Sequence, residues 1–86
     1  MDKQTEINQG REAESILESD VFKKAFINYK NELIKEWEST SRKELEIREN
    51  LFRAVQSLPE IERHLRIIVE KGKLTSKEFN ILKKVS

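Results

Sequence analysis

The stretch that decides the fold is residues 20–39, DVFKKAFINYKNELIKEWES. Its large apolar side chains recur in steps of four, three, four and four residues, at Phe22, Phe26, Tyr29, Leu33 and Trp37. This spacing is that of one face of an α-helix. Val21, Ala25, Ile27 and Ile34 widen the face enough to pack against another helix. Ser19 and Asp20 can cap the start and the hydroxyls of residues 39–41 favour a turn, so the sequence predicts a helix over 20–39.

A second long helix is expected to follow, over residues 42–71. Ser41 and Glu44 have the spacing of a capping box, in which two side chains satisfy two backbone N–H groups. One side of the segment carries Leu45, Leu51, Phe52, Val55, Leu58, Leu65, Ile68 and Val69. Gly72 can take the left-handed conformation that often ends a helix.

Pro59 leaves two readings of this second helix. A proline inside a helix removes one hydrogen bond and clashes with the carbonyl four residues earlier, that of Val55. The helix can therefore kink near Pro59, or it can break and restart at residues 57–60, which again have capping-box spacing. The kink is favoured because the apolar stripe continues across Pro59 in phase.

The flanking segments are shorter. Residues 1–10 are polar and end at Gly10, so they are expected to be a flexible N-terminal lead-in. A short helix is expected over 11–18 and a last one over 76–84, which carries Phe79 and Leu82. Residues 11–86 then form a single all-α domain. The short connection at 39–41 makes it an antiparallel helical hairpin with short flanking helices.

Length and hydropathy limit the class of protein. A chain of 86 residues without cysteine forms one small domain that no disulfide can stabilise. It has no apolar run of about 18 residues that would span a membrane. Its first residues lack the basic-then-apolar pattern of a secretion signal, so a cytoplasmic protein is expected.

The apolar faces are wider than one hairpin can cover. Large apolar side chains would stay exposed to water on a single copy, which costs solubility. We therefore expect a homo-oligomer that covers them. The interface residues that this reasoning selects are Phe22, Phe26, Phe52 and Ile68.

The charges nearly cancel over the whole chain, with 17 basic and 16 acidic side chains. The two ends differ, because residues 1–20 carry six acidic and two basic side chains whereas residues 71–86 carry five basic and one acidic. Such ends can steer contacts between chains, although solvated, flexible ends are the simpler reading. Nucleic-acid binding is not expected, because it requires a basic excess.

The sequence shows no catalytic or metal-binding motif. His64 is the only histidine, whereas a zinc site needs several ligands at defined spacing. The serines and threonines lie at expected caps, and no glycine-rich phosphate loop is present. We therefore expect neither an enzyme nor a cofactor.

Arginines of the second long helix are the candidates for ligand binding. Guanidinium groups grip phosphates with two parallel hydrogen bonds, and an aromatic ring can stack on a base. The candidate ligand-binding residues are Trp37, Arg48, Arg53, His64 and Arg66. The alternative is that these arginines pair with glutamates on a solvated helix face, as is common.

The order of several short motifs resembles that of a known group of proteins. These motifs are residues 13–17 (AESIL), 33–37 (LIKEW) followed by Thr40, 46–49 (EIRE), His64-Leu65 and 72–74 (GKL). Over residues 13–74 the chain is similar to short, uncharacterised helical proteins encoded by tailed bacteriophages near head and packaging genes. The resemblance implies a viral protein of an infected bacterial host and a helical hairpin. It implies no catalytic or binding residues, and Pro59 departs from the unbroken helix of that group.

These observations favour a non-enzymatic, phage-type binding or assembly protein that acts as a homo-oligomer. Another class of function is an oligomer that sequesters nucleotide immune signals and so counters host defence. A third is an inhibitor that lays a helix into a groove on a host protein. The expected partners are thus a second copy, a small nucleotide, or a host or virion protein, and no membrane.

Overall fold

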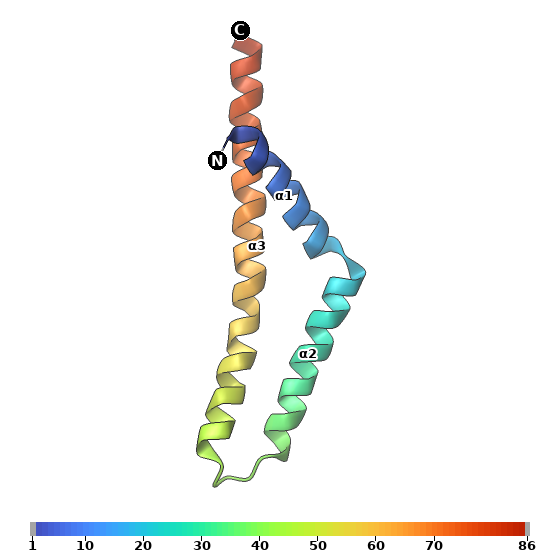
Figure 1. Cartoon of the computed structure of the whole chain (residues 1–86), viewed down its shortest axis with the longest axis vertical. Coiled ribbons are helices and arrows are strands. Elements are labelled where there is room, and N and C mark those ends of the chain that lie inside the picture. The colour runs from blue at the N-terminus through green and yellow to red at the C-terminus, as the bar shows by residue number, and fades with distance from the viewer. Residues whose placement is uncertain (1, 86) are drawn as a thin grey trace.

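The computed structural model describes residues 2–85, and side chains from Asp2 to Leu82. Three helices make up this part of the chain: α1 (Lys3–Glu18), α2 (Asp20–Ser39) and α3 (Leu45–Val85). The all-α prediction is confirmed. Figure 1 shows α1 and α2 following one another along a bent path, after which α3 runs back alongside both.

The ends of α2 depend on hydroxyl groups. The Ser19 hydroxyl accepts a hydrogen bond from the backbone N–H of Phe22 (3.2 Å). At the other end, the backbone N–H and the hydroxyl of Thr40 both donate to the Trp37 carbonyl, at 3.1 and 2.6 Å. The helix therefore has the range that its apolar spacing and its capping residues indicate.

The start of α3 differs slightly from expectation. Ser41 and Glu44 do interact, because the Ser41 N–H donates to the Glu44 carboxylate (3.2 Å) and the Glu44 N–H donates to the Ser41 carbonyl (3.1 Å). These bonds form a turn over residues 41–44, and the helix begins at Leu45 instead of residue 42.

The lead-in over residues 1–10 is a wrong prediction for the described residues 3–10, which belong to α1. The Asp2 carboxylate caps this helix by accepting from the Thr5 N–H at 2.7 Å. This hydrogen bond is the main cause of the lowered pKa of Asp2. Gly10 does not interrupt α1, because it lies against the backbone of α3.

The predicted stop at Gly72 and the separate helix over 76–84 are also wrong. α3 continues through Gly72 as one helix of 41 residues, and no residue between 2 and 85 has a positive φ. Pro59 lies inside this helix without breaking it. Figure 1 shows α3 as one continuous ribbon whose axis turns gently.

The closest packing is between α1 and α3. Gly10 and Gly72 are both buried at this crossing, where the two backbones approach each other. Ile7, Ala13, Val69 and Thr75 are buried as well. Between α2 and α3 the buried side chains are Leu33 and Leu58.

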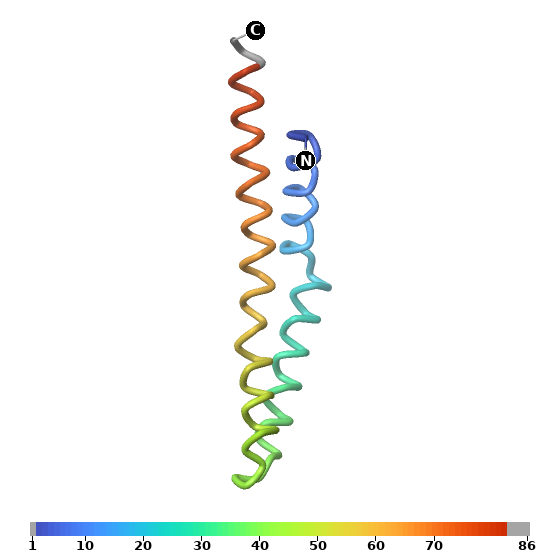
Figure 2. Tube along the Cα trace, turned by 60° about the vertical axis from the view of Figure 1, so that its left-hand side comes forward, coloured from blue at the N-terminus to red at the C-terminus, as the bar shows by residue number. Residues whose placement is uncertain are grey.

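The molecule is long and thin, with extents of 67 × 24 × 15 Å, as the trace in Figure 2 shows. Its radius of gyration is 19.0 Å, whereas a compact chain of this length has about 12 Å. Side chains 2–82 include none that is both large and less than 2% exposed. None of the helices α1 to α3 is apolar over a length that would cross a membrane.

Candidate interaction groove

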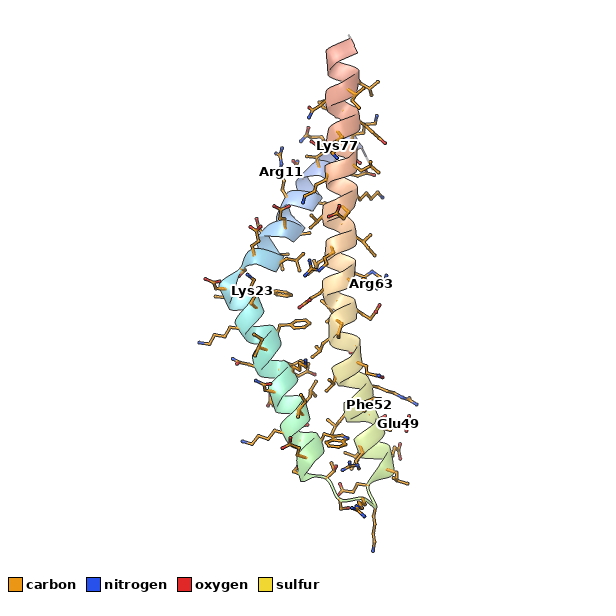
Figure 3. The ribbon with its side chains drawn as sticks, turned by 180° about the vertical axis from the view of Figure 1, so that it is seen from behind. Arg11, Lys23, Glu49, Phe52, Arg63 and Lys77 are labelled. Atoms are coloured by element: carbon orange, nitrogen blue, oxygen red, sulfur yellow. The ribbon has the colours of Figure 1, made fainter. Side chains whose placement is uncertain are left out.

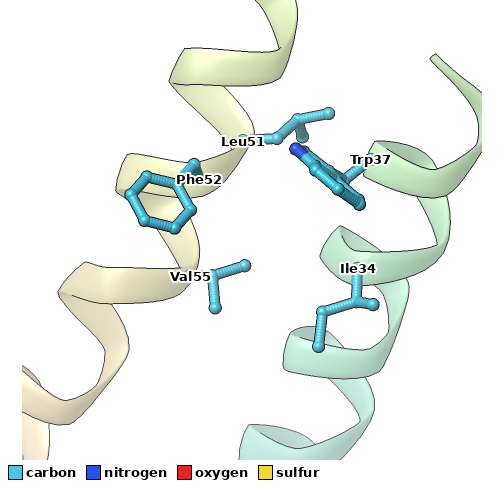
Figure 4. Close-up of a pocket in the computed structure, with 5 residues that line it drawn as sticks. All are labelled: Ile34, Trp37, Leu51, Phe52 and Val55. Carbon is cyan, nitrogen blue, oxygen red and sulfur yellow. The ribbon is translucent and has the colours of Figure 1, made fainter. Parts of the chain in front are cut away.

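An apolar pocket lies between α2 and α3 near their connection. Figure 4 shows Ile34 and Trp37 of α2 facing Leu51 and Val55 of α3, with the ring of Phe52 beside Val55. The pocket has a volume of about 280 Å³ and is lined by these five apolar side chains alone. Phe52 is 55% exposed and Trp37 38% exposed, so the pocket opens to solvent.

This pocket continues along the same two helices. Val55 also lines a second pocket of about 470 Å³. Phe26, Ile27 and Glu62 are shared by that pocket and a third of about 210 Å³, which extends to Phe22 and Arg66. We call these three connected pockets the α2–α3 groove. Its charged side chains are Lys23 and Lys30 on α2 and Glu62 and Arg66 on α3.

Arg48 contacts Trp37, which lines the end of the groove next to the connection. Its guanidinium lies 4.1 Å from the centroid of the Trp37 ring, which is a cation–π contact. One nitrogen of the guanidinium also donates to the hydroxyl (2.8 Å) and the carbonyl (3.4 Å) of Thr40. Arg48 therefore supplies hydrogen-bond donors to Thr40, the residue that caps the C-terminal end of α2, and it fixes the position of Trp37.

A polar cluster joins α1 to α3 at the opposite end of the molecule. The Thr75 hydroxyl, on a buried side chain, donates to the Glu6 carboxylate at 2.8 Å, and the Lys71 ammonium lies 3.6 Å from that carboxylate. The hydrogen bond from Thr75, together with the charge of Lys71, holds the pKa of Glu6 below its ordinary value. Lys73 and Glu14 form a further ion pair at 3.7 Å. This cluster orients α1 on α3.

The structure brings only two of the five candidate ligand-binding residues into contact. Trp37 and Arg48 stack on each other. Arg53 pairs with Glu49 at 3.1 Å on an exposed surface, and His64 is exposed. Arg66 lies at the far end of the groove, beside Phe22. The five side chains therefore do not form one site.

Some of the arginines of α3 form exposed ion pairs with glutamates of the same helix. Glu60 and Arg63 pair at 2.7 Å, which lowers the pKa of Glu60 and raises that of Arg63. Figure 3 shows Glu49 and Arg63 on the side of α3 that faces away from α2. Arg53 and Arg63 therefore pair with glutamates on a solvated helix face, whereas Arg48 contacts Trp37 and Thr40.

The four candidate interface residues have two different environments. Phe22 and Phe26 are half-buried, with ring centroids 5.7 Å apart, and both line the groove. Phe52 is 55% exposed and Ile68 39% exposed. Phe22, Phe26 and Phe52 therefore belong to one continuous surface, and Ile68 lines none of the three pockets of the groove.

Sequence reasoning missed the contact between Thr40 and Arg48 and the packing of Gly10 against Gly72. Thr40 follows the last turn of α2, and a polar residue eight positions before an arginine gives no local signal of contact. In the sequence Gly10 ends the expected lead-in and Gly72 ends the second expected long helix, although a glycine on a helix face can also mark close helix packing. Residues 2–85 contain no group of three or more His, Asp or Glu side chains placed to hold a metal ion.

No protein-family model, curated protein or solved structure matches this chain. The geometry of the groove and the exposed apolar surface are therefore the observations that bear on the function.

Proposed function

We propose that this protein is a non-enzymatic helical assembly protein that acts as a homo-oligomer. In this proposal α2 and α3 form an antiparallel hairpin whose groove is covered by another copy. The observation that carries it is the surface area. The single chain exposes 7143 Å², whereas a folded monomer of its mass exposes about 5,300 Å².

The excess of about 1,800 Å² has the size of a subunit interface. A standard interface buries about 800 Å² on each partner, and obligate homodimers bury about 1,000 Å² or more on each. Covering the excess would therefore bring the chain to the exposure of an ordinary folded subunit.

The composition of the exposed surface supports the same proposal. Among side chains 2–82, fifteen large apolar ones are at least 38% exposed. Those that line the groove are Ile27, Trp37 and Phe52. In the groove Ile27 lies beside Phe22 and Phe26, and Trp37 lies in one pocket with Phe52. Contiguous exposed apolar surface is typical of a face that binds another protein.

We also propose a phage accessory role for this assembly, which rests only on the order of short motifs over residues 13–74. A host or virion protein is then a further partner of the oligomer, and a helix face is the surface that would contact it. Mass spectrometry of purified virions would show whether the chain is a structural component.

The test of the homo-oligomer is sedimentation equilibrium of the full chain at micromolar concentration. We expect a mass above 10.2 kDa for the wild type. Phe52→Asp should shift the mass toward the monomer, because it introduces a charge into the apolar pocket. Val21→Asp is the matched control, since Val21 is 79% exposed and lines none of the pockets of the groove. A monomeric wild type would overturn the proposal.

A second candidate function is the sequestration of nucleotides. It is favoured by the far end of the groove, where Lys23 and Arg66 lie beside the rings of Phe22 and Phe26 in a pocket of about 210 Å³. Cations can bind phosphate oxygens there and the rings can contact a base.

Thermal unfolding with a panel of cyclic nucleotides and ADP-ribose derivatives tests this candidate. A nucleotide that binds the native protein raises the melting temperature by mass action. Arg66→Ala should abolish the increase, whereas Arg63→Ala, on the surface facing away from α2, should retain it. An unchanged melting temperature across the panel would exclude this function for those ligands.

A further inference from the structure

The central pocket of the α2–α3 groove carries charges of opposite sign on its two walls. Its lining includes Ile27 and Lys30 from α2 and Val55, Pro59 and Glu62 from α3. Lys30 and Glu62 are the charged residues of this pocket. Among the described residues, neither has an ion-pair partner within 4.0 Å in its own chain. The two walls are therefore complementary in charge, and neither charge is neutralised by a close pair.

We propose that the groove is occupied by the same groove of a second copy, related by a two-fold axis that runs along it. This inference rests on the homo-oligomer proposed above and specifies its surface and symmetry. Rotation about such an axis exchanges the two walls, so that α2 of each copy lies over α3 of the other. The result is a four-helix arrangement in which the apolar linings of both grooves form one core.

The same rotation pairs the charges. Lys30 and Glu62 line one pocket and so lie near each other along the groove. Rotation about an axis along the groove keeps the position of each residue along it, so Lys30 is brought near Glu62 of the partner subunit and Glu62 near Lys30 of the partner subunit. A two-fold axis across the groove would instead place α2 over α2 and would bring lysines near lysines. The Lys30–Glu62 pair of the central pocket therefore favours the first geometry. The same rotation brings Lys23 near Arg66 of the partner subunit at the far end of the groove, where two positive charges meet.

A second copy fits this surface better than an unrelated protein for two reasons. In the central pocket Lys30 and Glu62 complement each other under the rotation, so this part of the face is self-complementary. The excess exposed surface of about 1,800 Å² per chain also matches what an obligate homodimer buries on each subunit.

A charge-reversal experiment tests the pairing. Lys30→Glu places glutamates opposite each other at both symmetric contacts of the homodimer, and Glu62→Lys places lysines opposite each other. Each variant alone should raise the dimer dissociation constant about ten-fold, as expected when two ion pairs become two repulsions. Mixing the two variants should form a heterodimer with about the affinity of the wild type, because both contacts are then again attractive.

The mixture distinguishes contact between chains from contact within a chain. Each variant chain carries two like charges on its own walls, so an intrachain pair cannot explain recovery on mixing. Lys24→Glu, an exposed substitution on α2 that lines none of the pockets of the groove, is the control and should leave the dissociation constant unchanged.

The outcomes of this experiment separate the two proposals. Sedimentation and native mass spectrometry of the mixed sample would measure the amounts of monomer, homodimer and heterodimer. A monomeric wild type overturns the homo-oligomer itself. An oligomeric wild type whose variants are unaffected, or are weakened without recovery on mixing, retains the homo-oligomer and overturns the two-fold axis along the groove.

Discussion

Gly10 and Gly72 meet backbone to backbone where α1 crosses α3. A Cβ atom built on either glycine would lie 2.9 Å from the Cα atom of the other. The Cβ of Gly72 would also lie 3.1 Å from the Glu6 carbonyl oxygen, and that of Gly10 would lie 3.3 Å from the Ile68 carbonyl oxygen. These neighbours are backbone atoms that cannot move aside without shifting a helix. The two glycines therefore permit the close approach that buries Ile7 and Val69.

Replacing Gly72 by Ala should weaken the docking of α1. Overpacking costs about 1–3 kcal/mol, whereas alanine gains about 1 kcal/mol over glycine inside a helix. We expect a net loss of up to about 2 kcal/mol in urea denaturation, with faster amide hydrogen exchange in α1. Asn80→Ala, at an exposed position of α3, is the control for helix propensity and should be neutral or stabilising. An equal stabilisation by both substitutions would contradict the close crossing.

The docking of α1 should weaken in acid because of Glu6. Thr75 and Lys71 lower the pKa of this carboxylate below its ordinary value of 4.5. A group with a lowered pKa in the folded state contributes stability above its unfolded pKa, and this contribution is lost as the pH falls through the folded pKa. The window for Glu6 therefore begins near pH 4.5 and extends below it.

Glu6→Gln provides the measurement of this pH dependence. The stability difference between wild type and Glu6→Gln should be largest at neutral pH and should disappear in acid, when urea midpoints are compared across the range. Glu12→Gln, which removes an exposed carboxylate from the same helix, should leave the profile close to that of the wild type. A constant difference at all pH values would show that the charge of Glu6 does not stabilise the docking.

Arg48→Lys should destabilise the end of the groove. Lysine retains the charge but loses the planar stack on Trp37, and it cannot reproduce the guanidinium geometry toward Thr40. We expect a loss of about 1 kcal/mol in the free energy of unfolding. Trp37 is the only tryptophan of the chain, so its fluorescence should also change. Arg53→Lys, whose ion pair with Glu49 is exposed, is expected to change stability by a few tenths of a kcal/mol at most.

Pro59→Ala should stabilise α3. Proline inside a helix costs about 3 kcal/mol relative to alanine, since it lacks the N–H group and crowds the preceding turn. Pro59 is exposed, so its replacement creates no cavity in a packed core. We expect a gain of about 1–3 kcal/mol in thermal unfolding followed by circular dichroism. Gln56→Ala, one turn earlier, controls for propensity, and a loss of stability in Pro59→Ala would show that the ring itself packs in the groove.

Local rules predicted α2 well and the ends of α1 and α3 poorly. The apolar spacing of residues 22–37 and the hydroxyls at Ser19 and Thr40 act within one or two turns, so sequence alone defines that helix. Polar composition suggested flexibility for residues 1–10, although Asp2 supplies a cap and Ile7 faces α3. The contacts that hold this segment come from residues more than sixty positions away, such as Thr75.

For the candidate site, too, the sequence indicates which residues matter but not how they contact one another. The sequence predicts a role beyond helix formation for nine residues, because large or bidentate side chains stand out in any pattern: Phe22, Phe26, Trp37, Arg48, Phe52, Arg53, His64, Arg66 and Ile68. It could not indicate that Arg48 stacks on Trp37 while Arg53 points to solvent, since both lie on one helix and differ only in their direction relative to α2.

The sequence by itself determined that the chain is helical and that its apolar side chains exceed what a thin helical protein can bury. Both properties follow from periodicity and composition, which need no knowledge of neighbours. The tertiary structure decided that Gly72 continues α3 instead of ending it. A glycine in isolation favours a helix stop because its backbone is less restricted, and only the backbone of α1, in contact at Gly10, makes the absence of a side chain necessary within an unbroken helix.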